Sequence, residues 1–234
     1  MWNVRHKEIT RSTNLDARSG RPGDVFTAAW QSGGRGRLDH KWHGARGENL
    51  MMSAVIDVRG LDAQQIATLP LAVGLALAKA IAQLAPLARV SIKWPNDIFA
   101  DNRKIAGILC ELNGEAAIAG IGVNVLETSF PPDIAERAAS LAMLGSQAGI
   151  KDTLDTVLAT LESVLAIWRK HGFGELLAQI DTLDALKGKY VSVLRNDADH
   201  SPASGIAQGI ADDGALIISG ERIYAGEVHI QSVT

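Results

Sequence analysis

The chain has 234 residues, of which 47% are hydrophobic and 21% charged, so it can form one sizeable core or two modest ones. Its formal net charge of −3 excludes an overall electrostatic footprint for nucleic acid, and we expect no nucleic-acid partner. The N-terminus has no apolar signal core, and the apolar run 66–88 is interrupted by prolines and a lysine, so we expect no membrane span. The single cysteine, Cys110, rules out an internal disulfide and favours a cytoplasmic protein.

The first two thirds of the chain predict an α+β domain in which antiparallel hairpins dominate. A short helix over residues 15–18 follows Ser12-Thr13-Asn14, which is typical of a helix N-cap, and the apolar stretch 69–84 predicts a longer helix. Asn113-Gly114 is a strong hairpin turn, and Asp101-Asn102-Arg103 indicates a second one. Strands are predicted over residues 25–30, 50–58, 90–93, 98–99, 104–112 and 116–125. No βαβ dinucleotide-binding unit is expected.

The last third changes character twice. Apolar residues at helical spacing between Leu154 and Trp168 predict a helix that packs on the core, and a second helix is expected over residues 175–183. Short strands with turn signals between them follow at residues 190–194, 205–211, 216–219 and 222–230. We therefore predict an α+β domain over residues 1–184 and a small all-β barrel over residues 185–234.

The segment from Gln31 to Trp42 suits a ligand that is anionic at one end and planar at the other. Its three glycines let backbone N–H groups approach an anion closely. Arg35, Arg37 and Lys41 add positive charge, and the indole of Trp42 offers a flat face for a heterocycle. The spacing matches neither a Walker A loop nor the dinucleotide fingerprint. The alternative for this segment taken alone is a mobile surface turn.

A second cluster brackets a predicted hairpin, with Lys93-Trp-Pro-Asn-Asp97 on one side and Arg103-Lys-Ile-Ala-Gly107 on the other. Asp97 and Lys104 then fall on adjacent strands and can face one space, where the lysine could hold a phosphate. The alternative is a surface ion pair worth about 0–1 kcal/mol. Glycines in Gly120-Ile-Gly-Val-Asn124 indicate close approach by a ligand or another chain, and the asparagine could contact a base edge.

These segments, taken together and in this order, resemble biotin protein ligases. The likeness rests on the glycine-rich segment with Trp42, on the two segments of the hairpin cluster, on the Gly120 segment and on Ser12-Thr13-Asn14. The resemblance implies a catalytic domain of the class II aminoacyl-tRNA synthetase/biotin ligase-like type, a mixed sheet with helices, followed by the small C-terminal barrel. The chain looks like the short bacterial form, which starts at the catalytic domain and lacks the N-terminal helix-turn-helix DNA-binding domain.

The implied reaction is the ATP-dependent biotinylation of a lysine on a biotin carboxyl carrier protein, a subunit of acetyl-CoA carboxylase. The biotin carboxylate attacks the α-phosphate of ATP, which is bound with Mg²⁺, and gives biotinyl-5′-AMP and pyrophosphate. The carrier lysine then attacks the mixed anhydride and releases AMP. Both steps move negative charge near phosphate, so fixed cations and backbone dipoles should supply most of the catalysis.

The resemblance also implies roles for single residues. Lys104 would hold the biotin carboxylate and the α-phosphate together, and Arg35 and Arg37 would order the loop over the intermediate and shield it from water. Asp97 would position or deprotonate the carrier lysine. Biotin would contact Ser12, Thr13, Asn14, Gln31, Gly34, Arg35, Gly36, Arg37, Lys104, Gly107 and Gly120. The nucleotide would contact Arg37, His40, Trp42, Lys104, Gly122 and Asn124, and no resident metal site is implied.

Two departures from the family pattern concern the nucleotide. Leu38-Asp39-His40 replaces a more basic stretch seen in some relatives, and Gln231 stands where some members carry an arginine near ATP. The contribution of the C-terminal unit to ATP binding is therefore open. The alternative functions are a lipoate protein ligase, which shares the fold and the adenylate chemistry, and a non-catalytic sensor of biotin or biotinyl-AMP. A homodimer that depends on ligand is also expected.

Overall fold

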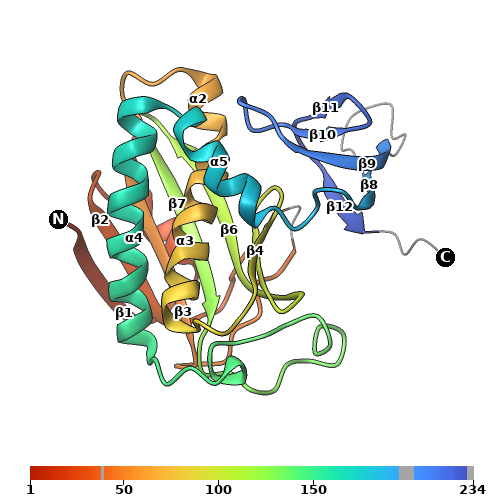
Figure 1. Ribbon diagram of the computed structural model, residues 1–234. Coiled ribbons are helices and arrows are strands. Elements are labelled where there is room, and N and C mark those ends of the chain that lie inside the picture. The colour runs from red at the N-terminus through yellow and green to blue at the C-terminus, as the bar shows by residue number, and fades with distance from the viewer. Residues whose placement is uncertain (38–39, 195–202, 231–234) are drawn as a thin grey trace.

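The computed structural model describes residues 1–37, 40–194 and 203–230, whose arrangement is shown in Figure 1. A seven-stranded mixed sheet in the order β1-β2-β3-β7-β6-β5-β4 forms the larger unit. β1 and β2 run parallel, whereas every other described pair in this sheet is antiparallel. The strands are β1 (Asn3–Thr10), β2 (Asp24–Gln31), β3 (Asn49–Asp57), β4 (Val90–Lys93), β5 (Asp97–Ala100), β6 (Arg103–Asn113) and β7 (Ala116–Asn124).

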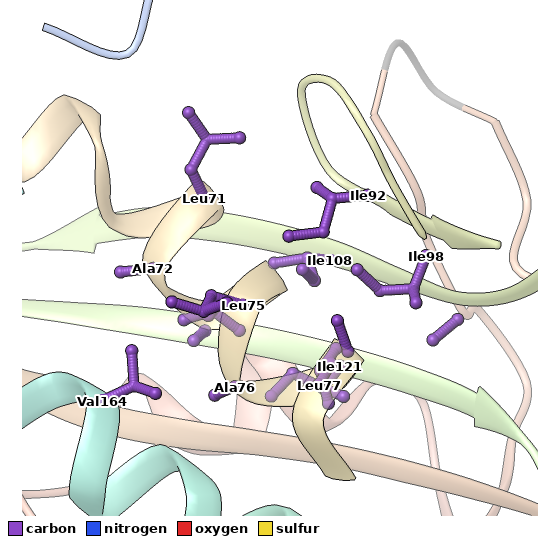
Figure 2. Packing of buried hydrophobic residues seen from close by; sticks show 14 of the residues in the cluster. Leu71, Ala72, Leu75, Ala76, Leu77, Ile92, Ile98, Ile108, Ile121 and Val164 are labelled. Atoms are coloured by element: carbon purple, nitrogen blue, oxygen red, sulfur yellow. The ribbon is translucent and has the colours of Figure 1, made fainter. Parts of the chain in front are cut away.

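Two long helices, α3 (Leu69–Leu84) and α4 (Ile150–His171), cover one face of this sheet (Figure 1). α3 packs against the sheet, α4 and α5 (Gly174–Leu183), and for this reason its alanines and leucines are buried on most sides. In Figure 2, Leu75 of α3 lies among side chains of the sheet and of α4. Leu75 is fully buried, so its truncation to alanine would cost about 2–5 kcal/mol of stability.

The opposite face of the sheet carries the short helix α1 (Thr13–Ala17). A separate cluster of Ala17, Phe26, Val55 and Ile118 packs there, on side chains that alternate along the strands with those beneath α3 and α4. Ser12 occupies the N-cap position of α1, as the sequence predicts, although its side chain makes no capping hydrogen bond. The helix thus holds its polar N-terminal residues against the middle of the sheet.

Strand β1, helix α2 (Ala63–Ala67) and the 3-10 helix η1 (Ala142–Leu144) are absent from the sequence predictions, and α1 begins two residues before its predicted start; the other helices and strands of this unit overlap the predicted ones. The side chains of β1 are exposed at every position except Thr10, because the strand lies at the edge of the sheet. Its sequence therefore shows no alternation of apolar and polar residues that would reveal a strand. The parallel β1–α1–β2 connection makes the sheet mixed, while antiparallel pairs dominate the described part of this domain as expected.

The C-terminal unit is a five-stranded antiparallel sheet in the order β11-β10-β9-β8-β12. Residues 222–230 were predicted as one strand but form two, because the chain turns at Tyr224-Ala225-Gly226. The edge strands β11 and β12 are not paired with each other within the described residues, so these residues form an open antiparallel sheet, and the barrel stays a prediction. The strands are β8 (Tyr190–Leu194), β9 (Ala203–Ile210), β10 (Leu216–Ile218), β11 (Glu221–Ile223) and β12 (Glu227–Ile230).

One hydrogen bond joins the C-terminal unit to the β4–β5 turn, and another joins the segment before that unit to β4. Trp94 Nε1 donates to the carbonyl of Gly214 at 2.9 Å, and the backbone N–H of Ala185 donates to the carbonyl of Ile92 at 2.9 Å. This contact brings the start of β12 beside the turn that carries Asp97. A boundary after residue 184 stays a prediction.

Candidate functional site

The glycine-rich segment folds into a short hairpin that lies on the sheet. Arg35 and Lys41 form an antiparallel bridge, and the backbone N–H of Trp42 donates to the carbonyl of Gly34 at 3.1 Å. The indole of Trp42 then packs on β6 and β7, where a Cβ at Gly107 would lie 3.0 Å from the ring atom Cζ3, and one at Gly122 would lie 2.9 Å from Cδ2. The ring occupies the space that the Cβ of a larger residue would need at these positions, so a larger residue would have to displace it.

The N-terminal residues of α1 form a neutral polar end of the site. Gln31 Oε1 accepts from the backbone N–H of Thr13 at 2.7 Å, and Ser53 Oγ donates to Asn14 Oδ1 at 2.6 Å. Ser12, Thr13 and Asn14 are all buried. The sequence prediction grouped Ser12, Thr13, Asn14 and Gln31, and the fold brings them together with the middle of β3.

The hairpin cluster forms a charged end of the site. Lys104 Nζ lies 2.7 Å from Asp97 Oδ1, which confirms that these side chains face one space on adjacent strands. The same carboxylate oxygen is buried and accepts no well-oriented hydrogen bond. Lys104 Nζ also lies 5.9 Å from the centroid of the Trp42 ring. Because both side chains of this ion pair are partly exposed, a phosphate can compete with Asp97 for the lysine.

Two further cations are partly withdrawn from water at this end. Burial lowers the pKa of Lys93, although Asp97 opposes the shift. Burial likewise lowers the pKa of Arg37, whose Nη1 donates at 3.4 Å to Asn96 Oδ1 and at 3.4 Å to the carbonyl of Gly226. Arg37 therefore joins the glycine-rich hairpin, the β4–β5 turn and the C-terminal sheet.

The polar and charged ends open into one cavity. Among the described residues that line it, five are cations and two are carboxylates, so its field favours an anionic ligand. These are Arg35, Arg37, Lys41, Lys93 and Lys104, with Asp97 and Glu227. The predicted residues that line the cavity are Ser12, Thr13, Asn14, Gln31, Arg35, Gly36, Arg37, His40, Trp42, Asp97, Lys104, Gly107, Gly120 and Gly122.

Gly34 and Asn124 were predicted to contact ligand but lie outside the described lining of this cavity. The carbonyl of Gly34 is used by Trp42, and Asn124 is buried with its Nδ2 donating to the carbonyl of Ala139 at 2.9 Å. Their contacts with biotin and nucleotide stay predictions. The departures at Leu38, Asp39 and Gln231 lie outside the described residues.

Several polar residues of the site were not assigned a role from the sequence. Lys93 and Asn96 belong to a segment that was singled out, and Glu227 to one that was compared with the family, so local signals for them existed. Ser53 and Glu111 have no such signal. They contact Asn14 only because β3, β6 and β7 pair in one particular register.

Cys110 is unsuited to nucleophilic chemistry, because burial raises the pKa of its thiol to about 12. Within the described ranges, no group of three or more His, Cys, Asp or Glu side chains is placed to hold a metal ion. None of the described helices is long and apolar enough to cross a membrane.

Known protein families match the parts of the chain that contain these site residues. A family model described as the biotin/lipoate A/B protein ligase family matches residues 7–126, and the biotin protein ligase C-terminal domain model matches residues 188–230. The biotin–[acetyl-CoA-carboxylase] ligase of Mycobacterium tuberculosis is 34% identical, with 94% of this chain and 85% of that protein covered. The ligase of the same name from Paracoccus denitrificans is 30% identical, with 90% and 92% covered. The structure of biotin protein ligase from Aquifex aeolicus in complex with biotin and ATP superposes with a TM-score of 0.88 at 26% identity, covering 99% of this chain and 100% of that one.

Proposed function

Since this chain belongs to the biotin/lipoate A/B protein ligase family, we propose that it attaches biotin to a lysine of a biotin carboxyl carrier protein at the expense of ATP. The observation that carries the proposal is the single cavity with a neutral, hydrogen-bonding end and a cationic end. Biotinyl-5′-AMP has the matching shape, with an uncharged ureido ring at one end and a phosphate in its middle. The names of the relatives support biotin over lipoate and a carrier of the acetyl-CoA carboxylase type.

In the first step, a carboxylate oxygen of biotin forms a bond to the α-phosphorus of ATP while the bond to the bridging oxygen breaks and pyrophosphate leaves. Two anions must approach each other, so the step needs positive charge placed beforehand. Lys104 supplies it between the carboxylate and the α-phosphate, giving up its contact with Asp97. Arg35 and Arg37 draw the glycine-rich hairpin over the intermediate and exclude water, which would hydrolyse the mixed anhydride.

In the second step, the neutral amine of the carrier lysine attacks the carbonyl carbon of the anhydride. An amide bond forms, the bond from that carbon to the phosphate oxygen breaks, and AMP leaves. Asp97, which lies beside Lys104, accepts the proton of the amine or orients it. Trp42 flanks the adenine during both steps.

The remaining parts of the proposal concern the setting of the reaction. ATP enters as its Mg²⁺ complex, so the metal is part of the substrate, and Asp97 and Glu227 are carboxylates of the kind that Mg²⁺ prefers. The closure of the C-terminal sheet into a barrel, a cytoplasmic location and a homodimer that depends on ligand are also proposed. Sedimentation of the protein with and without biotin and ATP tests the last of these, and a monomer in both conditions would exclude it.

Biotin-dependent exchange of radiolabel between pyrophosphate and ATP tests the proposed function directly. We expect exchange with biotin and none with lipoate, followed by transfer to an acetyl-CoA carboxylase carrier domain. Exchange with lipoate alone would assign the chain to lipoate ligation. Stoichiometric binding of biotin without exchange would instead support a sensor that binds the ligand and signals through a partner.

A further inference from the structure

Glu111 of β6 contacts both the polar end of the site and the glycine-rich hairpin, although it does not line the cavity as described. Its Oε2 accepts from Asn14 Nδ2 at 2.6 Å, and its Oε1 lies 3.4 Å from Arg35 Nη2 and 3.5 Å from Arg18 Nη2. One carboxylate oxygen is thus bound to the polar end, and the other is bound to the glycine-rich hairpin. The side chain is 24% exposed, so both contacts are partly shielded from water.

These contacts complete a chain of hydrogen bonds that leaves the hairpin and returns to it. Gln31, where β2 enters the hairpin, accepts from the backbone N–H of Thr13 at 2.7 Å, so the hydroxyl proton of Thr13 can be donated to Ser53 Oγ. Ser53 Oγ lies 2.7 Å from Thr13 Oγ1 and 2.6 Å from Asn14 Oδ1. Asn14 then donates to Glu111, which holds Arg35 inside the hairpin. Gln31 and Arg35, two residues on the first arm of the hairpin, are therefore connected through the residues that are proposed to receive biotin.

The amide of Asn14 has a fixed orientation in this chain. Its oxygen faces Ser53, and its nitrogen faces Glu111 and, at 3.4 Å, the carbonyl of Leu109. Gly120 closes the space beneath it, since a Cβ there would lie 2.8 Å from Asn14 Cγ. Without Glu111, the amide could turn over and exchange its donor and acceptor, which a ureido ring distinguishes.

We propose that Glu111 is a positioning residue that couples the biotin end of the site to the hairpin that retains the adenylate. The inference rests on the proposed function and extends it to a residue that reaches the substrate only through others. Its Oε2 sets the direction of the Asn14 amide, and its Oε1 keeps Arg35 over the cavity. The two oxygens have separate tasks, so substitutions can separate the two effects.

The substitution Glu111→Gln separates them. A glutamine can turn its oxygen to Asn14 and keep that hydrogen bond, but it then presents an NH₂ group to Arg35 and loses the ion pair. We expect biotin affinity, measured by calorimetry without ATP, to stay within about twofold of wild type. We expect labelled biotinyl-AMP to leave the enzyme about three- to fivefold faster, as for the loss of one exposed ion pair.

The substitution Glu111→Ala removes both contacts. We expect biotin to bind about tenfold more weakly or worse, because a charge-assisted hydrogen bond is lost, and the adenylate to leave faster as well. The double variant Glu111→Gln/Arg35→Ala should release the adenylate at the same rate as Arg35→Ala alone, because Glu111 acts on the hairpin through Arg35. A normal biotin affinity in the alanine variant, or independent effects in the double variant, would overturn the inference.

A matched control is available at Asp57, a carboxylate with 27% side-chain exposure that contacts Arg59 at 2.9 Å and Arg169 at 3.6 Å outside the site. We expect Asp57→Asn to leave biotin affinity and adenylate release unchanged. If it raised release as much as Glu111→Gln, the effect would be a general loss of stability and the inference would fail. If wild type neither bound biotin nor exchanged pyrophosphate, the proposed function itself would fail.

Discussion

The polar and charged ends of the cavity are built on different principles. At the polar end Ser12, Thr13 and Asn14 are no more than 5% exposed, and the last two have partners that fix their side chains. At the charged end the side chain of Lys104 is 37% exposed and its main contact is an ion pair that a ligand can displace. An uncharged ring system needs donors and acceptors that are already oriented, whereas a phosphate needs a surplus of mobile positive charge. The difference indicates that the polar end confers selectivity and the charged end confers reactivity.

Removal of Lys104 is the most severe way to break the charged end while leaving the polar end intact. We expect Lys104→Ala to lower the rate of adenylation by about 10²–10³, as for the loss of one preorganised partner of developing charge. Biotin affinity should fall far less, because the polar end contains the oriented contacts. Pyrophosphate exchange and calorimetry measure the two quantities, and near wild-type exchange would remove Lys104 from its proposed role.

Two glycines on β7, Gly120 and Gly122, lie against different parts of the site. Replacing either one by alanine adds a single methyl group and disturbs only the part that it contacts. A methyl group at Gly120 would press on the amide of Asn14, with Cγ only 2.8 Å away. We expect Gly120→Ala to weaken biotin binding by about 10², because the amide is held on its other sides and cannot yield without losing its partners. The KM for ATP should change little, and an unchanged affinity for biotin in calorimetry would show that the polar end tolerates rearrangement.

The matched change at Gly122 acts on the hairpin instead. Its methyl group would press on the indole of Trp42. The neighbouring residues Lys41 and His43 are exposed, so this segment can shift and the indole can move away. We therefore expect Gly122→Ala to raise the KM for ATP by only about tenfold and to spare biotin affinity. Steady-state pyrophosphate exchange at varied ATP gives the value. A larger loss of biotin affinity than of ATP affinity would contradict the assignment of the two ends.

The two ends also differ in how far the sequence predicts them. Asp97 and Lys104 of the charged end come from a single local hairpin, so they could be placed on adjacent strands from spacing alone. The polar end draws Asn14, Ser53 and Glu111 from α1, β3 and β6, and only the register of the sheet brings them together. Strand β1 could not be predicted for another reason. It is an exposed edge strand and has no apolar face that the sequence could reveal.

The smallest expected effect concerns the pH dependence of the charged end. Burial lowers the pKa of Lys93, and the nearby Lys104 and Arg137 act in the same direction against Asp97 and Glu227. As the pH rises, Lys93 therefore loses its charge earlier than an ordinary lysine, and the cavity loses attraction for ATP. Arginine keeps its charge, so we expect Lys93→Arg to extend the alkaline limb of kcat/KM for ATP beyond that of wild type after normalisation at neutral pH. Biotin affinity, set at the polar end, should show no such difference between the two proteins. Superimposable alkaline limbs would mean that the charge of Lys93 does not contribute to ATP binding, and Lys104 and the two arginines would then account for the attraction at this end.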